Sequence, residues 1–227
     1  HDGPMTDSPV HIGSARVQPS ADGVQGDYVS MGTERYYRIA NYDRMSPFFM
    51  SIVSDADHWL FISSTGGLTA GRISPETALF PYTTVDKIQE STPHTGSKTL
   101  MRVDQEEGFA LWEPFNNNCH ARYRTSRHLY KNTLGNKLCF EETNHDLCLT
   151  FRYTWMTSDR YGFIRYCELE NHAGHPVNVE ILDGLQNILP AGTPRQLTLG
   201  GTLMMDLGPQ DVTVTVDDQS GPVAGAR

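Results

Sequence analysis

The chain has 227 residues, and its content of 38% hydrophobic and 20% charged residues is ordinary for a globular protein with a sizeable core. The formal net charge is −9, and the 18 lysines and arginines form no basic run, which disfavours binding to the phosphate backbone of a nucleic acid. No apolar run approaches the roughly 20 residues that a membrane-spanning helix needs, and the first residues lack the apolar core of a secretory signal. We therefore expect a cytoplasmic protein that binds neither nucleic acid nor a membrane.

The composition changes along the chain and suggests three regions. Residues 1–27 are rich in Gly, Pro, Ser and Asp and are expected to form a flexible N-terminal extension. Residues 28–190 are expected to form one β-sandwich domain. Residues 191–227 begin with a linker-like stretch, and short strands are expected at 197–206 and 212–216.

A first hairpin is expected from two strands at residues 47–54 and 59–64. Gly66 and Gly67 then break the second strand, because adjacent glycines allow backbone angles that other residues do not tolerate. One interpretation is a β-bulge or a turn without a ligand. The other is a backbone ledge beside a sugar, with Arg72 as a forked donor to hydroxyl groups.

The middle of the chain alternates between connections and short strands. Residues 73–98 contain three prolines and are expected to form a long connection with little regular structure. Residues 100–103 and 109–112 are expected to pair as a hairpin. Two further strands are expected at 121–125 and 137–142.

An aromatic and amide-rich segment follows the strand that ends at Trp112. Aromatic rings stack on the apolar face of a sugar ring, and amides bond its hydroxyl groups. Trp112, Phe115 and Asn116 are therefore candidate carbohydrate contacts. The alternative is a core tryptophan followed by a polar turn.

The clearest strand pattern begins at Leu147, where apolar and polar residues alternate as far as Trp155. The chain then returns through residues 163–170, turns at 171–176 and continues through residues 177–181. We expect these segments to form a three-stranded meander. Because helical periodicity is nearly absent, the predicted fold class is all-β, with a large antiparallel two-sheet sandwich.

Common catalytic and metal-binding patterns are absent from the sequence: it has no nucleophile elbow, HExxH motif, P-loop or dinucleotide fingerprint. His172 and His175 lie in a turn with a spacing compatible with a metal, but no third ligand is evident, so we expect no metal or other cofactor. Most acidic residues, such as Glu106 and Glu107, lie in predicted turns, where solvation explains them, whereas Glu141 and Glu142 end the strand expected at 137–142. Asp183, at the end of an apolar strand, is expected to accept bonds from a neighbouring turn.

The cysteines allow two interpretations. The chain contains Cys119, Cys139, Cys148 and Cys167, and no CxxC pair, so a structural zinc site is disfavoured. Cys139 and Cys148 flank a predicted hairpin turn and could form a disulfide. Free thiols in a cytosolic protein are the favoured alternative.

The hairpin of residues 47–64, its Thr65-Gly66-Gly67 turn with Arg72 beyond it, and the strand end Trp112-Glu113-Pro114 resemble a known family. The chain over residues 36–190 is similar to the N-terminal β-sandwich of the cellobiose-phosphorylase-like enzymes. The resemblance implies a super-sandwich related in shape to galactose-mutarotase-like folds. In the family this domain precedes a helical (α/α)6 barrel that carries the catalytic Asp.

The resemblance implies a non-catalytic domain of a glycoside phosphorylase or hydrolase acting on β-glucans or oligosaccharides. It would support the barrel, shape the substrate cleft and build a homodimer interface. This sequence has no long helical region, so we expect the catalytic barrel to be absent from the chain and assign no catalytic residue. Gly66, Gly67, Arg72, Trp112, Phe115 and Asn116 are the expected substrate-binding residues.

Two alternatives remain open at this level. One is a stand-alone carbohydrate-binding or sugar-modifying sandwich, which as an epimerase would need a His and Glu pair on its concave face. His120, His128 and His145 are the candidate histidines for that role. The other is a purely structural or adhesive sandwich.

Overall fold

The computed structural model describes residues 23–84, 87–88, 91–117 and 122–190, and the backbone of short strands at 10–12, 15–17, 214–215 and 225–226. The described residues form antiparallel strands and two single-turn 3-10 helices, η1 (Tyr42–Arg44) and η2 (Pro75–Thr77). The predicted all-β class is therefore confirmed. Among the described residues, no helix has the length and apolar character needed to cross a membrane.

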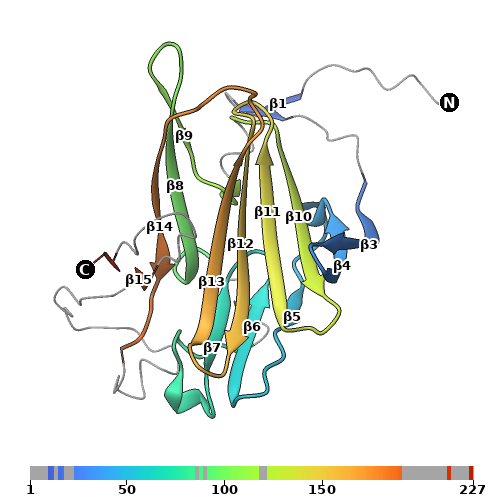
Figure 1. Cartoon of the computed structure of the whole chain (residues 1–227), viewed down its shortest axis with the longest axis vertical. Coiled ribbons are helices and arrows are strands. Elements are labelled where there is room, and N and C mark those ends of the chain that lie inside the picture. Colours follow the sequence, from blue (N-terminus) through green and yellow to red (C-terminus); the bar gives the residue numbers. More distant parts are fainter. Residues whose placement is uncertain are drawn as a thin grey trace.

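A six-stranded antiparallel sheet forms one layer of the molecule, in the strand order β13-β12-β11-β10-β4-β3 (Figure 1). Its strands, in chain order, are β3 (Gln25–Met31), β4 (Glu34–Ala40), β10 (Thr125–Asn132), β11 (Lys137–Asn144), β12 (Leu149–Ser158) and β13 (Gly162–Asn171).

Two three-stranded sheets form the facing layer, in the orders β5-β6-β7 and β14-β8-β9. Their strands are β5 (Phe49–Ser51), β6 (His58–Ser63), β7 (Leu68–Arg72), β8 (Gly96–Asp104), β9 (Phe109–Trp112) and β14 (Val179–Gln186). Two short pairs complete the described strands, namely β1 (Val10–Ile12) with β2 (Ala15–Val17) and β15 (Val214–Thr215) with β16 (Gly225–Ala226).

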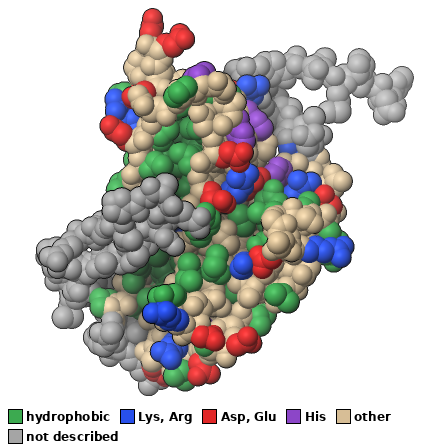
Figure 2. Space-filling model, viewed as in Figure 1, with side chains coloured by type: hydrophobic (Ala, Val, Ile, Leu, Met, Phe, Trp, Pro, Cys, Tyr) green, Lys and Arg blue, Asp and Glu red, His purple; other side chains and the backbone are tan. Residues whose placement is uncertain are grey.

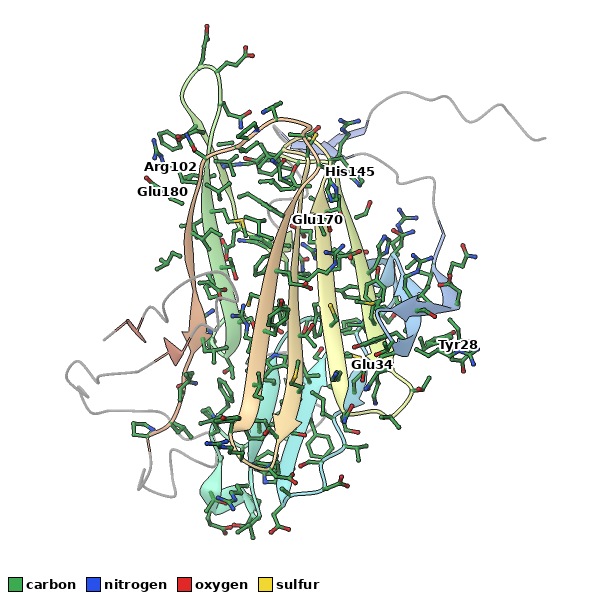
Figure 3. All side chains as sticks on the ribbon, in the orientation of Figure 1. Tyr28, Glu34, Arg102, His145, Glu170 and Glu180 are labelled. Carbon is green, nitrogen blue, oxygen red and sulfur yellow. The ribbon has the colours of Figure 1, made fainter. Side chains whose placement is uncertain are left out.

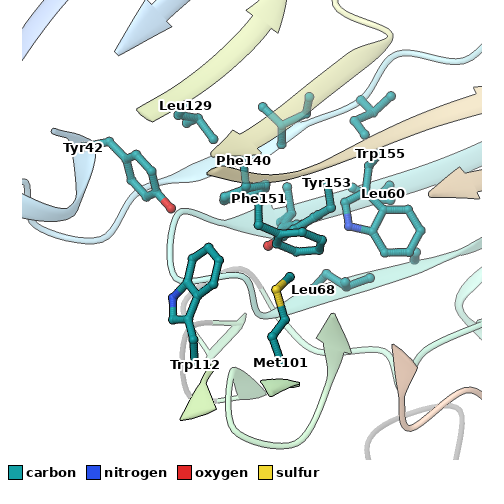
Figure 4. Close-up of a cluster of buried hydrophobic side chains, with 14 of the residues drawn as sticks. Tyr42, Leu60, Leu68, Met101, Trp112, Leu129, Phe140, Phe151, Tyr153 and Trp155 are labelled. Carbon is teal, nitrogen blue, oxygen red and sulfur yellow. The ribbon is translucent and has the colours of Figure 1, made fainter. Parts of the chain in front are cut away.

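The hydrophobic core lies between the two layers (Figure 4). On β12 the period-two pattern places Leu149, Phe151, Tyr153 and Trp155 on the inner face, where each is at most 3% exposed. From the facing layer, β6, β7, β8 and β9 contribute Leu60, Leu68, Met101 and Trp112 to the same cluster. The apolar residues of the alternating pattern thus form part of the inward face of the six-stranded sheet.

Charged side chains of both signs are interspersed on the outer surface, together with single apolar side chains (Figure 2). Along the β8–β14 pair, Arg102 bonds Glu180 across the strands at 3.1 Å (Figure 3). Exposed pairs of this kind stabilise a sheet little.

The predicted three-stranded meander is wrong at its third strand. β12 and β13 form a hairpin as expected, but β14 crosses to the other layer and pairs with β8, from Val179 opposite Val103 to Gln186 opposite Gly96. Alternation predicts that a segment is a strand but not which partner it takes. Here β8 offers β14 a continuous ladder of eight residue pairs.

Other boundaries also differ from the prediction. The strand expected at 121–125 is instead β10, which starts at Thr125, while residues 122–124 form a turn and residue 121 lies outside the described residues. The N-terminal extension expected at 1–27 contains β1, β2 and the start of β3; its other residues before 23 lie outside the described part. Of the strands expected after residue 190, 197–206 lies outside the described residues, and 212–216 includes β15.

The described cysteines are all free thiols: Cys139, Cys148 and Cys167. The disulfide alternative for Cys139 and Cys148 is therefore wrong. Cys119 lies outside the described residues.

One ion pair joins the edges of the two layers. The Arg165 guanidinium of β13 donates to both carboxylate oxygens of Asp183 on β14, at 2.7 and 2.9 Å, and to the Ser97 hydroxyl at 2.7 Å. Thr99 also donates to Asp183, at 2.6 Å. The partners of Asp183 thus lie on strands, and the expected bonds from a turn are not found among the described residues.

The Asp183 ion pair should make the stability of the protein depend on pH. Burial alone would raise the pKa of Asp183, but the hydrogen bonds and charge of Arg165 hold it below its ordinary 3.8. The pKa of Asp183 is lower in the folded protein than in the unfolded chain. The ion pair therefore stabilises the protein fully at pH values above the unfolded-state pKa, and this stabilisation is lost as the pH falls through the folded-state pKa. At pH 7 we expect Asp183→Asn to lower the free energy of unfolding by about 2 kcal/mol in urea titrations.

The difference in free energy of unfolding between wild type and Asp183→Asn should shrink as the pH falls below about 4. Asp159→Asn, in the exposed turn between β12 and β13, is the matched control and should change stability by less than about 0.5 kcal/mol. A difference between wild type and Asp183→Asn that stays constant from neutral to acidic pH would contradict this account.

Candidate functional site

A cavity of about 540 Å³ opens between the two layers. The inner face of the six-stranded sheet forms its floor, through β10, β11 and β12. Its walls come from η1, the β6–β7 turn, the start of β8, the end of β14 and the loop at residues 113–117 after β9. The cavity therefore gathers segments that are far apart in the sequence.

Aromatic side chains make up much of the floor. The Phe140 and Tyr153 rings stack at a centroid distance of 4.9 Å and an interplanar angle of 15°. Phe115 packs edge-on against both rings, at 6.3 and 5.1 Å. Burial raises the pKa of Tyr153, so its phenol stays protonated at neutral pH.

The loop at residues 113–117 places polar groups around the mouth of the cavity. Phe115 has a positive φ of 66°, a conformation that a non-glycine residue adopts only where its surroundings hold it. Asn116 donates to Glu113 at 2.8 Å, and Glu113 also pairs with Lys98. The Asn117 amide oxygen accepts a bond from Arg127 at 2.8 Å.

The buried carboxylate of Glu142 holds this loop against the sheet. It lies on β11, is 1% exposed and accepts bonds from the Trp112 indole at 2.7 Å, the Phe115 backbone N–H at 3.0 Å and the Arg127 guanidinium at 2.7 Å. Glu142 is therefore a buried carboxylate at the position where the sequence predicts a strand. Glu141 is also buried and pairs with Arg152 on the outer face of the sheet.

The β6–β7 turn forms the opposite wall. Gly66 has a φ of 93°, and its N–H donates to the Ser63 carbonyl at 2.9 Å. A side chain at Gly67 would collide with the Ile88 carbonyl, so the glycine allows a close approach of two backbone segments. The Thr65 hydroxyl bonds that of Thr92 at 2.6 Å and so tethers the turn.

The structure brings together three of the six residues expected to bind substrate. Gly66, Phe115 and Asn116 line one cavity, and Gly67 adjoins Gly66 in the turn. Trp112 is fully buried, so its ring is a core side chain with no face open to a ligand. Arg72 lies at the far end of β7, opposite His58, because the antiparallel return of β7 carries it away from the Gly66 turn.

Several residues of the cavity carried no signal in the sequence. Tyr42, Lys98 and Arg127 line it, and Glu142 supports it from behind. None belongs to a recognisable motif, and each comes from a different segment. The buried position of Glu142 could have been suspected from its place at the end of an apolar strand.

The described histidines do not line the cavity. His128 accepts a bond from the Asn41 backbone N–H at 3.1 Å, and burial lowers its pKa. His145 bonds Ser126 at 2.6 Å, and His172 bonds Thr150 at 2.9 Å. The described residues contain no cluster of His, Cys, Asp or Glu able to hold a metal ion, and His120 lies outside them.

The chain matches no protein-family model and no curated protein sequence. The resemblance to the cellobiose-phosphorylase-like enzymes thus rests on its motifs alone. The Thr65-Gly66-Gly67 turn, one of these motifs, lies at the cavity.

Replacing Glu142 by Gln should destabilise the protein and loosen the loop at residues 113–117. The substitution leaves the Arg127 guanidinium buried without its counter-charge, which costs about 3 kcal/mol. Urea titration followed by tryptophan fluorescence would measure this loss, since Trp112 bonds Glu142 directly.

The matched control is Glu107→Gln in the exposed β8–β9 loop, where we expect a change below about 0.5 kcal/mol. If Glu142→Gln were as stable as this control, the buried carboxylate would not be what holds the loop.

Proposed function

We propose that the chain is a non-catalytic β-sandwich domain of a carbohydrate-active enzyme, and that it contacts an oligosaccharide or polysaccharide at the cavity between its layers. The observation that carries this proposal is the lining of the cavity. It combines the aromatic rings of Phe115, Phe140 and Tyr153 with the amides of Asn116 and Asn117 and with nearby hydroxyl groups. Rings that cover apolar C–H faces, beside groups that bond hydroxyls, suit a sugar.

The size of the cavity fits this proposal. Its volume of about 540 Å³ lies within the roughly 300–1,000 Å³ that is usual for small-molecule sites. The aromatic floor is rigid because its rings pack against one another and against the core. A preorganised site of this kind loses little conformational freedom when a ligand binds.

The proposal assigns the chemical step to another domain. A glycosidase needs two carboxylates across its cleft. Three carboxylates lie at or near the cavity: Asp43 lines it, Glu113 is engaged by Lys98 and Asn116, and Glu142 is engaged by three donors. Glu113 and Glu142 hold the loop, which favours a supporting domain.

The family resemblance supplies the wider context of the proposal. We propose a super-sandwich of the galactose-mutarotase-like kind in a glycoside phosphorylase or hydrolase that acts on β-glucans or oligosaccharides. Its partners would be a helical catalytic domain of the same enzyme and a second copy of this chain. A stand-alone sugar-modifying sandwich is less well supported, because none of the described histidines faces the cavity.

Calorimetric titration with neutral β-linked glucose disaccharides tests the binding site. Asn116→Ala should weaken binding about fivefold, as expected for one lost hydrogen bond. Asn178→Ala, on an exposed residue next to β14, should bind as the wild type does. If all three proteins bound the disaccharide with equal affinity, the sugar would not bind at Asn116.

Activity assays test the non-catalytic role. We expect the purified chain to release neither sugar nor sugar phosphate from β-glucosides, with or without inorganic phosphate. Turnover that disappears when one of the chain's own carboxylates is replaced would show that it is an enzyme in its own right.

A further inference from the structure

Two largely buried residues line the cavity, and each has one donor atom for which no partner is found among the described residues. The first is the hydroxyl of Tyr42, which is 4% exposed. Figure 4 shows this hydroxyl directed into the space between the layers, towards the side where Trp112 lies. The hydroxyl is not among the buried atoms that lack a partner, so it opens onto the cavity, where a ligand can bond it.

The position of Tyr42 is fixed by its surroundings. Its ring packs edge-on against Phe140 at 6.0 Å. The preceding residue, Asn41, has a positive φ of 56° and is held by bonds to the Gly23 carbonyl and to His128, each at 3.1 Å. The hydroxyl is therefore presented to the cavity by a rigid support.

The second group is the guanidinium of Arg127, which is 5% exposed. Glu142 holds its Nε and Asn117 holds its Nη1, while Nη2 has no partner among the described residues. The charge of Arg127 acts on the Tyr42 hydroxyl and offsets part of the rise in pKa that burial causes there. Both residues line the same cavity, so one ligand there could contact both.

The charges around the cavity indicate what kind of ligand this is. Asp43 and Glu113 offset Lys98 and Arg127 among the lining residues, and Glu142 behind Arg127 adds one more negative charge. An anionic ligand would therefore meet no excess of positive charge. Arg127 acts here as a fixed hydrogen-bond donor whose charge is already neutralised.

We propose that Tyr42 and Arg127 form a donor pair that selects an uncharged, hydroxyl-bearing sugar at this cavity and disfavours its anionic counterparts. Arg127 donates to a sugar oxygen, and the Tyr42 hydroxyl donates to or accepts from a neighbouring one. The ring of Phe115, which lines the cavity and is only half-buried, covers the apolar side of the same sugar ring. This specificity rests on the proposed carbohydrate-binding function.

The test compares cellobiose with glucuronosyl-β-1,4-glucose, which differ at one position by a carboxylate, in calorimetric titrations of the whole chain. We expect wild type to bind cellobiose at least about tenfold more tightly than the uronate. Tyr42→Phe removes only the hydroxyl and should weaken cellobiose binding about tenfold. Because that hydroxyl has no described partner in the protein, the melting temperature should not fall.

Tyr161→Phe is the matched control, since Tyr161 is 68% exposed in the turn between β12 and β13. It should leave cellobiose binding unchanged. If Tyr42→Phe binds cellobiose as well as the wild type does, or if the uronate binds more tightly, the donor pair is refuted while carbohydrate binding stands. If the wild type binds no neutral saccharide at all, the proposed function itself fails.

Discussion

The arrangement of the cavity depends on one buried carboxylate, that of Glu142. A charge without contact to solvent is costly unless it is paired and hydrogen-bonded. Here Arg127 supplies the opposite charge, and two N–H groups, from the Trp112 ring and the Phe115 backbone, supply further donors. Because these three donors come from β9, the following loop and β10, satisfying Glu142 brings all three segments to one point of the sheet.

The same constraint explains the unusual backbone near the cavity. Phe115 adopts a positive φ, which costs free energy for a residue with a side chain. The bond from its N–H to Glu142 and its contacts with Phe140, Phe151 and Tyr153 offset that cost. The loop is therefore held in place by the core and can present Asn116 and Asn117 in fixed positions.

The second organising contact lies at the edge of the sandwich. Arg165 and Asp183 connect β13 with β14, which belong to different layers although they follow each other in the chain. The thiol of Cys167 lies beside this pair and donates to Asp183 at 3.5 Å. Burial raises the pKa of Cys167 to about 12, so the thiol stays protonated and serves packing and hydrogen bonding at neutral pH.

The sequence by itself determined the kind of structure that this chain forms. Alternation from Leu147 to Trp155 showed that β12 has one apolar face, and the glycines after Ser64 showed where β6 ends, because both patterns reflect local backbone geometry. It could not determine the partner of β14, since many strands offer equivalent ladders and tertiary packing makes the choice.

Only the tertiary structure decided which candidate residues meet. In the folded protein Gly66, Phe115 and Asn116 line one cavity. Trp112 is buried in the core, and Arg72 lies at the far end of β7. It also brought Tyr42, Arg127 and Glu142 to the cavity from three separate segments. The reason is physical: burying and pairing a charge depends on residues that are distant in the sequence, and no local pattern records those contacts.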